Sequence, residues 1–227
     1  MARPAGLVRI SDLAGAEIRY ARTRRHRYGT PGKAHPNSVM PEMAEQLQKC
    51  FAELWRVCPY GPAEGVVSAG GWVDKPGMHG RGLALDVDAI WWKLDDFDRP
   101  QPMITNNAPH DAGRYLAVSA VLRMFFGTVI GYWCNRAHRD HFHVALRPVG
   151  FSPASKSEVA FVQAACLHVH GSNPGPVDRL WGPRTRAAVA QVVDIAGGDL
   201  RDRQGWDAFL RETFLAGWKC AENPWAE

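Results

Sequence analysis

The stretch MHGRGLALDVDAIW, residues 78–91, holds the pattern that decides the fold. From Leu83 to Trp92, apolar and polar side chains alternate at first, which is typical of a strand with one buried face. Because successive side chains of a strand point to opposite faces, Asp86 and Asp88 share one face. The sequence therefore predicts a strand that presents two carboxylates on the same side.

The segment before this strand predicts a tight turn that carries a histidine. If His79 and Asp86 bound one ion, the chain between them would have to fold back, because an extended chain would separate them by ~23 Å. Gly80 and Gly82 permit such a reversal, since glycine adopts backbone conformations that other residues avoid. The glycines and the histidine–aspartate spacing thus support the same interpretation.

A second polar cluster, HRDHFH, occupies residues 138–143. If this segment is a strand, His141 and His143 lie on one side, and Asp140 points to the other side unless a turn precedes His141. Neutral imidazoles and a carboxylate suit zinc, which commonly takes three protein ligands and one water in catalytic sites. The two clusters together predict a metal site, and strand geometry favours His141 as the near neighbour of the metal.

The surrounding chain predicts an α+β fold with a small antiparallel sheet and flanking helices. Helices are expected over residues 41–58 and 111–126, and strands over residues 64–73, 83–92, 128–134 and 141–146. Strands and helices do not alternate regularly, which argues against a parallel sheet.

A linker is expected near residues 147–153, between a first domain at 1–148 and a second at 155–227. Ser155 and Glu158 have capping-box spacing, Pro183 starts another helix that closes at Gly197-Gly198, and a final helix carries the stripe that includes Trp206. We expect three short helices here.

Charge and composition narrow the function classes. The chain has 227 residues and a formal net charge of +4, with a strongly basic segment from Arg19 to Arg27. This segment is interpreted mainly as a solvated face, and otherwise as a surface that attracts a polyanion. Aromatic residues do not alternate with these charges, so a nucleic-acid partner is not expected. Nothing indicates a particular oligomeric state, and a monomer is favoured.

Cysteine usage and the N-terminal sequence bear on the compartment. Five cysteines without tight pairs argue against a disulfide framework, although Cys50 and Cys58 remain a candidate pair under oxidising conditions. The first twenty residues lack the apolar core of a signal peptide, and no segment approaches the length of a membrane span. We therefore expect a cytoplasmic product without a membrane partner, which acts on any external substrate only after release.

The motif His79-x-x-Gly82-x-Ala84-x-Asp86, followed by Asp140-x-x-His143, resembles the zinc signature of the D-alanyl-D-alanine carboxypeptidase superfamily, which includes phage endolysins. Residues 126–144 are similar to the bacterial extensin-like C-terminal domain of that group. The resemblance covers residues 40–148 and leaves the basic segment 1–39 outside. It implies a zinc peptidase that cuts peptides of bacterial peptidoglycan, with His79, Asp86 and His143 as zinc ligands. It also implies Asp140 as general base and His141 as a helper, whereas strand geometry favours His141.

The chain also departs from that pattern. Gly77 stands where the family often has serine, and the stretch from Ser68 to Trp72 lacks the arginine that carboxypeptidases use to stabilise the oxyanion. Strict carboxypeptidase specificity is therefore not expected. Candidate substrate contacts are Trp72, Arg81 and His138.

The segment from Val177 to Val189 is similar to the three-helix peptidoglycan-binding domain, which implies wall contacts from Asp178, Trp181 and Arg184. The sequence thus predicts an endolysin-type zinc peptidase with a wall-binding segment. The alternatives are a non-catalytic wall-binding protein, a cellular wall-remodelling carboxypeptidase and, more weakly, a nucleic-acid-binding protein.

Overall fold

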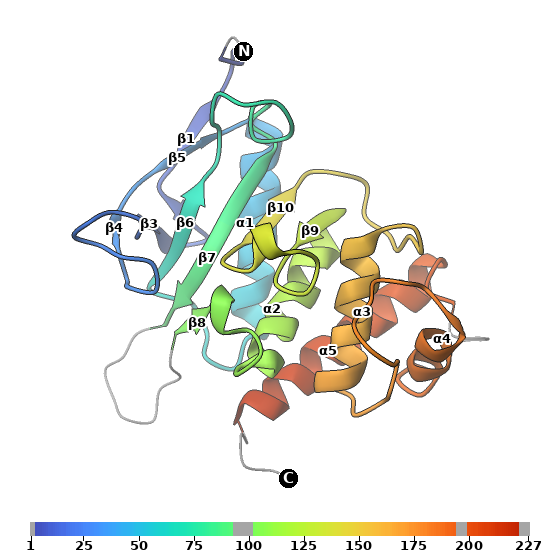
Figure 1. The fold of residues 1–227 in the computed structure, drawn as a ribbon. Coiled ribbons are helices and arrows are strands. Elements are labelled where there is room, and N and C mark those ends of the chain that lie inside the picture. Colours follow the sequence, from blue (N-terminus) through green and yellow to red (C-terminus); the bar gives the residue numbers. More distant parts are fainter. Residues whose placement is uncertain (1–2, 93–101, 194–198, 223–227) are drawn as a thin grey trace.

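The fold is mixed α+β, as a computed structural model shows for residues 3–92, 102–193 and 199–222. In these ranges the chain forms five α-helices and an eight-stranded sheet, with one further two-stranded ribbon. Figure 1 shows the strands on one side of the molecule and helices α3, α4 and α5 on the other. The strands are β1 (Val8–Ile10), β2 (Asp12–Leu13), β3 (Ala16–Tyr20), β4 (Lys33–Ala34), β5 (Asn37–Val39), β6 (Gly65–Gly70), β7 (Ala84–Trp91), β8 (Met103–Ile104), β9 (Thr128–Ile130) and β10 (Phe142–Ala145).

The main sheet follows the order β2-β3-β6-β7-β10-β9, with β4 on β3 and β8 on β7. The strands β6, β7, β10 and β9 pair antiparallel, as the sequence predicts. The prediction of a wholly antiparallel sheet is wrong, because β3 runs parallel to β6. Strand β3 of this parallel pair lies in the N-terminal 39 residues, which the sequence pattern marks only as a basic segment. Their strands span two to five residues, too short for a periodic pattern to stand out.

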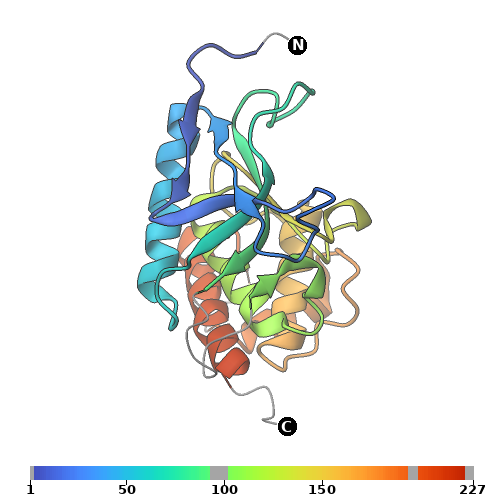
Figure 2. The same cartoon turned by 90° about the vertical axis from the view of Figure 1, so that its left-hand side faces the viewer.

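Helix α1 (Pro41–Val57) packs its apolar stripe against the sheet. Pro41 suits the first turn, where its missing N–H costs nothing. The stripe holds Met43, Leu47 and Phe51, all fully buried, and the Trp55 indole donates a hydrogen bond to the Leu13 carbonyl at 3.0 Å. Figure 2, turned by 90°, shows α1 standing beside the strands. The helix thereby fixes one face of the sheet and leaves the other for polar side chains.

Helix α2 (Ala112–Phe125) is the central helix, because it packs against α1, α3 and α5. The helices after it are α3 (Lys156–His168), α4 (Pro183–Ala190) and α5 (Arg203–Glu222), and the 3₁₀ turns are η1 (Thr105–Asn107) and η2 (Arg136–His138). The capping prediction is confirmed, since the Ser155 hydroxyl accepts from the Glu158 amide. The predicted helix end at Gly197-Gly198 lies outside the described residues. No described helix is both long enough and apolar enough to cross a bilayer.

The prediction of three short helices in the C-terminal segment differs from the structure in its last helix. Helix α5 spans 20 residues and lies along α2, where a side chain added at Gly217 would come within 2.5 Å of the Gly113 carbonyl oxygen. Phe209, Trp206 and Trp218 of α5 belong to the same buried cluster as the residues behind the sheet. The division into two domains at residues 148–155 stays a prediction.

Candidate metal centre

Two metal-ligand candidates are brought together by strand register. In the antiparallel pair of β7 and β10, Asp86 lies directly opposite His143. Directly opposed residues project to the same face of a sheet, with their Cβ atoms only ~5 Å apart. The His143 Nδ1 accordingly lies 2.9 Å from the Asp86 Oδ1. The pairing thus joins residues that are 57 positions apart in the chain.

The turn before β7 adds the third residue, His79. The Gly82 amide donates to the His79 carbonyl at 2.9 Å, and Gly82 has a φ of 70°, a left-handed conformation that favours glycine. At Gly80 a Cβ atom would lie 1.8 Å from the Lys75 carbonyl oxygen, so only glycine fits. Both glycines therefore serve the chain reversal that their positions predict.

The three ligand atoms converge at distances that suit a metal ion. The His79 Nε2 lies 3.1 Å from the Asp86 Oδ1 and 3.0 Å from the His143 Nδ1. His79 is buried and donates from Nδ1 to the Gly71 carbonyl at 2.6 Å, so its Nε2 faces the cluster as a lone pair when the ring is neutral. That lone pair then faces a carboxylate oxygen, which is also an acceptor. A cation between them relieves the conflict.

His79, Asp86 and His143 can thus hold a metal ion. Tetrahedral zinc with bonds of ~2.0–2.1 Å would separate its ligand atoms by ~3.3–3.4 Å, which is only slightly wider than the spacing found. The Gly71 carbonyl behind His79 is the kind of outer partner that fixes the ring of a metal-bound histidine. Burial acts to raise the pKa of Asp86, but the neighbouring His143 and His79 side chains outweigh it and hold that pKa well below its usual value. The carboxylate stays ionised.

Asp140 and His141 form a hydrogen-bonded pair beside this cluster. The His141 Nδ1 lies 2.8 Å from the Asp140 Oδ1, and the His141 Nε2 lies 3.8 Å from the Asp86 Oδ1. Strand β10 begins only at Phe142, so a bend precedes it and Asp140 reaches the same side as His141. The local bend that Asp140 required is therefore present.

A third side chain, Arg22, fixes this pair and was missed by sequence reasoning. Its Nε and Nη2 donate to the two oxygens of Asp88 at 2.7 and 2.9 Å, and its Nη1 donates to the Asp140 Oδ2 at 2.9 Å. Burial raises the pKa of Asp88, and Arg22 offsets part of that rise. Partial burial acts to raise the pKa of Asp140, but His141 and Arg22 bring it below its usual value. No sequence motif marks Arg22, because its partners lie 66 and 118 positions away.

The three candidate substrate contacts differ in position. The His138 ring lies 5.0 Å from that of His141 and 5.8 Å from that of His143, and burial with these two neighbours lowers its pKa to about 4. Trp72 is half-buried beneath the Arg3 guanidinium, and Arg81 is exposed with its Nη1 near the Met78 sulfur. The structure thus brings His138 to the cluster, whereas within the described residues neither Trp72 nor Arg81 makes a polar contact with it.

The candidate wall contacts lie in the C-terminal segment. The Asp178 carboxylate accepts from the Gln163 side chain at 2.8 Å and from the Leu180 amide at 2.9 Å. The Trp181 ring packs 4.7 Å from that of Phe151, and Arg184 is exposed. Asp178 therefore orders the loop before α4, and Trp181 packs partly against the hydrophobic core.

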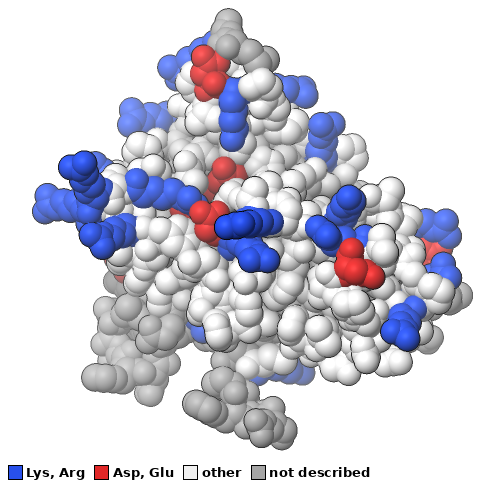
Figure 3. Space-filling view, in the orientation of Figure 1, with Lys and Arg blue, Asp and Glu red and all other residues white. Residues whose placement is uncertain are grey.

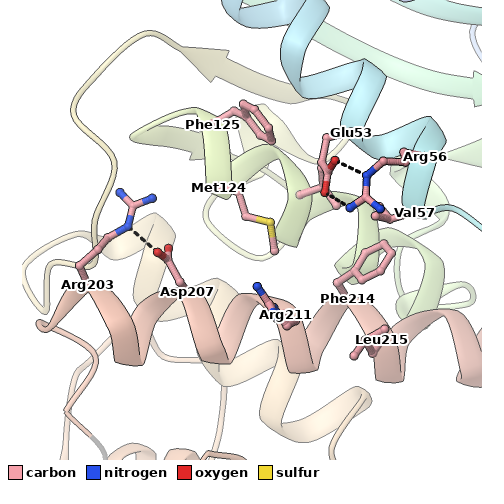
Figure 4. A pocket seen from close by; sticks show the side chains of 11 residues that line it. Glu53, Arg56, Val57, Met124, Phe125, Arg203, Asp207, Arg211, Phe214 and Leu215 are labelled. Carbon is pink, nitrogen blue, oxygen red and sulfur yellow. Dashed lines mark hydrogen bonds and ion pairs between the residues drawn. The ribbon is translucent and has the colours of Figure 1, made fainter.

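Other features lie apart from the cluster. A cavity of about 490 Å³ lies between α1, α2 and α5, with Met124, Phe125 and Phe214 among its apolar lining (Figure 4). None of its lining residues belongs to the metal-ligand group. All five cysteines are free thiols, so the candidate pair Cys50–Cys58 is not bonded.

No family model, curated protein or solved structure matches this chain.

Proposed function

We propose that this chain is a zinc-dependent hydrolase that cuts an amide bond in the peptides of bacterial peptidoglycan. The observation that carries the proposal is the convergence of His79, Asp86 and His143 beside the Asp140–His141 pair. Two histidines and one carboxylate form one of the ligand sets of catalytic zinc. A proton-transfer pair next to such a site is what amide hydrolysis requires.

The protein residues would divide the work as follows. When bound, zinc supplies a water of lowered pKa and polarises the substrate carbonyl. Asp140 uses one oxygen for His141 and the other for Arg22, so it suits an orienting role. His141 keeps its Nε2 toward the ligand group and is placed to accept the proton of the attacking water, then to pass it to the leaving amine. His138 is neutral at pH 7 and donates from Nδ1 to the Asn135 Oδ1 at 2.8 Å, so its Nε2 is left to accept a hydrogen bond from the substrate.

The resemblance supplies the substrate class in this proposal. We assign the chain to the D-alanyl-D-alanine carboxypeptidase superfamily, close to the extensin-like domain, on the zinc motif quoted above. Asp86 and His143 lie on the antiparallel pair of β7 and β10, and this pairing supports the assignment. Residues 155–227 are then the wall-binding three-helix domain, in which Asp178, Trp181 and Arg184 are the candidate contacts. An endolysin-type role, with action on the wall after release, follows from the same reasoning.

The test is digestion of purified peptidoglycan, with released amines and fragment masses as readouts. The zinc-loaded chain is expected to release new amines, and the chelated chain is not. His79→Ala should abolish release and lower zinc affinity, whereas His110→Ala, at an exposed histidine outside the group, should do neither. His141→Ala should lower kcat by about 10²–10⁴-fold with zinc still bound, as for loss of a general base. Unchanged hydrolysis after chelation, or by His79→Ala, would refute the proposal.

A further inference from the structure

The loop between β3 and β4 carries three arginines whose side chains have no partner among the residues that the structure describes. Arg24, Arg25 and Arg27 are exposed, and in the described ranges their side chains make no hydrogen bond or ion pair. The turn that presents them is ordered, because the His26 amide donates to the Thr23 hydroxyl at 2.9 Å. Like charges this close repel one another, so their gathering brings no stability of its own.

This loop begins at the candidate catalytic residues. Arg22, two positions before Arg24, is held by Asp88 and Asp140, and Asp140 bonds His141. The exposed side chains of Arg24, Arg25 and Arg27 therefore project from the loop next to the site. Figure 3 shows basic side chains gathered over this loop and again near the middle of the same face, with acidic atoms between.

A second pair of arginines borders the site from the side of η2. Arg136 begins η2 and Arg139 follows it, and both are exposed. Between them is His138, whose ring contacts those of His141 and His143. The two arginine groups thus flank one site. The first group follows Arg22, which bonds Asp140, and the second borders His138, which packs on His141 and His143.

The aromatic side chains nearby argue against a nucleic-acid partner. The Tyr28 ring has the Arg22 guanidinium over it at 5.2 Å, and the Tyr132 ring has that of Arg139 at 5.4 Å. The guanidinium takes one face of each ring, which reduces the surface on which bases could stack, and stacking is the usual means of binding single strands. Guanidinium groups bind carboxylates well, and often through two hydrogen bonds.

We propose that Arg24, Arg25 and Arg27, together with Arg136 and Arg139, bind free carboxylates on the substrate peptide on either side of the scissile amide. The chain then prefers acidic peptides whose carboxylates are free over the same peptides with carboxamides. This inference rests on the proposed function and names the chemical form of its substrate.

The test measures hydrolysis of two synthetic wall peptides by the zinc-loaded full chain. The peptides are identical except that one has free carboxylates where the other has carboxamides. The free form is expected to have about tenfold higher kcat/KM, mainly through KM, because charges outside the reacting centre act on encounter and binding. The variant Arg24→Gln/Arg25→Gln/Arg27→Gln should lose most of this preference and keep kcat within about twofold, since these side chains do not touch the reacting groups. Equal KM values for the two peptides would overturn the proposal.

A matched control separates local binding from net charge. Arg9→Gln/Arg186→Gln/Arg211→Gln removes the same charge from exposed positions whose side chains also make no hydrogen bond or ion pair in the described part of the chain. It should retain the preference. An equal loss in both triple variants would mean that only the overall charge matters, and the proposal would fail.

Direct binding distinguishes this inference from the proposed function. Fluorescence anisotropy with the labelled acidic peptide and the chelated chain measures recognition without turnover. If binding is weaker in Arg24→Gln/Arg25→Gln/Arg27→Gln and the zinc-loaded chain hydrolyses no amide, the result would support carboxylate recognition and refute the proposed hydrolase function. Hydrolysis of both peptides at equal rates would do the reverse. Tighter binding of a single-stranded oligonucleotide, lost in the same variant, would identify a nucleic acid as the partner and overturn the proposal.

Discussion

Removal of Arg22 tests whether the Asp88 ion pair holds the loop on the sheet. Asp88 is 1 % exposed and receives two hydrogen bonds from Arg22. Arg22→Met leaves this carboxylate buried without its counter-charge, which costs about 3–5 kcal/mol in comparable cases. The contact with Asp140 adds at most about 1 kcal/mol, because that side chain is 41 % exposed. We expect a loss of at least about 3 kcal/mol in the free energy of unfolding.

A double-mutant cycle isolates the pair. Asp88→Leu alone should cost about 1 kcal/mol, because Arg22 is 30 % exposed and can turn to water and Asp140. In Arg22→Met/Asp88→Leu no charge is left buried, so the coupling energy should be about 2–3 kcal/mol. The assay is urea unfolding followed by circular dichroism, with chelator present so that metal binding does not contribute.

Two outcomes decide the matter. A loss below about 1 kcal/mol for Arg22→Met, or a coupling energy below about 0.5 kcal/mol, would refute the reasoning, because independent sites add within that margin. If Arg22→Met does not fold, Arg22→Lys gives the same test at smaller amplitude. An ammonium cannot reproduce the two-pronged contact, so an intermediate loss is expected.

Three further predictions follow from backbone geometry and burial. Ala14 and Arg179 have φ values of 51° and 67°, which glycine adopts more readily. In urea unfolding, Ala14→Gly should therefore raise the free energy of unfolding by up to about 1 kcal/mol. Arg179→Gly should raise it less, because this variant also loses the hydrogen bond to the Cys134 carbonyl. Gly80→Ala should weaken metal affinity at least about tenfold in a competition assay, because the added carbon displaces the turn that carries His79. His170 has a pKa lowered to about 4 by burial, so folding stability should fall as the pH drops from 6.5 toward 4, and His170→Asn should remove that part of the slope; an unchanged slope contradicts this.

The candidate site was largely predictable from the sequence, and the N-terminal part of the fold was not. The motif resemblance grouped His79, Asp86 and His143, and local patterns, a glycine turn and two strands, agree with that grouping. Arg22 could not be found this way. Its role depends on β3 lying parallel beside β6, and a pairing between distant segments leaves no periodic signal in either of them.

Helix α5 illustrates the same limit. Its helical form and its apolar stripe with Trp206 and Phe209 could be predicted from the sequence. Which surface the stripe covers could not be predicted, because any apolar groove of suitable width satisfies the pattern. The close approach of Gly113 and Gly217 sets the surface that α5 covers. Nothing in the sequence around these two glycines indicates that their helices meet there.

The opposed positions of Asp86 and His143 have a consequence for folding. A slip of β10 against β7 by one residue would send one of these side chains to the opposite face, and a slip by two would separate them by the length of two residues. Only one alignment of the two strands therefore assembles the ligand group. A cation that binds there would stabilise the chain only in that alignment, so metal in the refolding buffer would favour correctly paired molecules over misaligned ones.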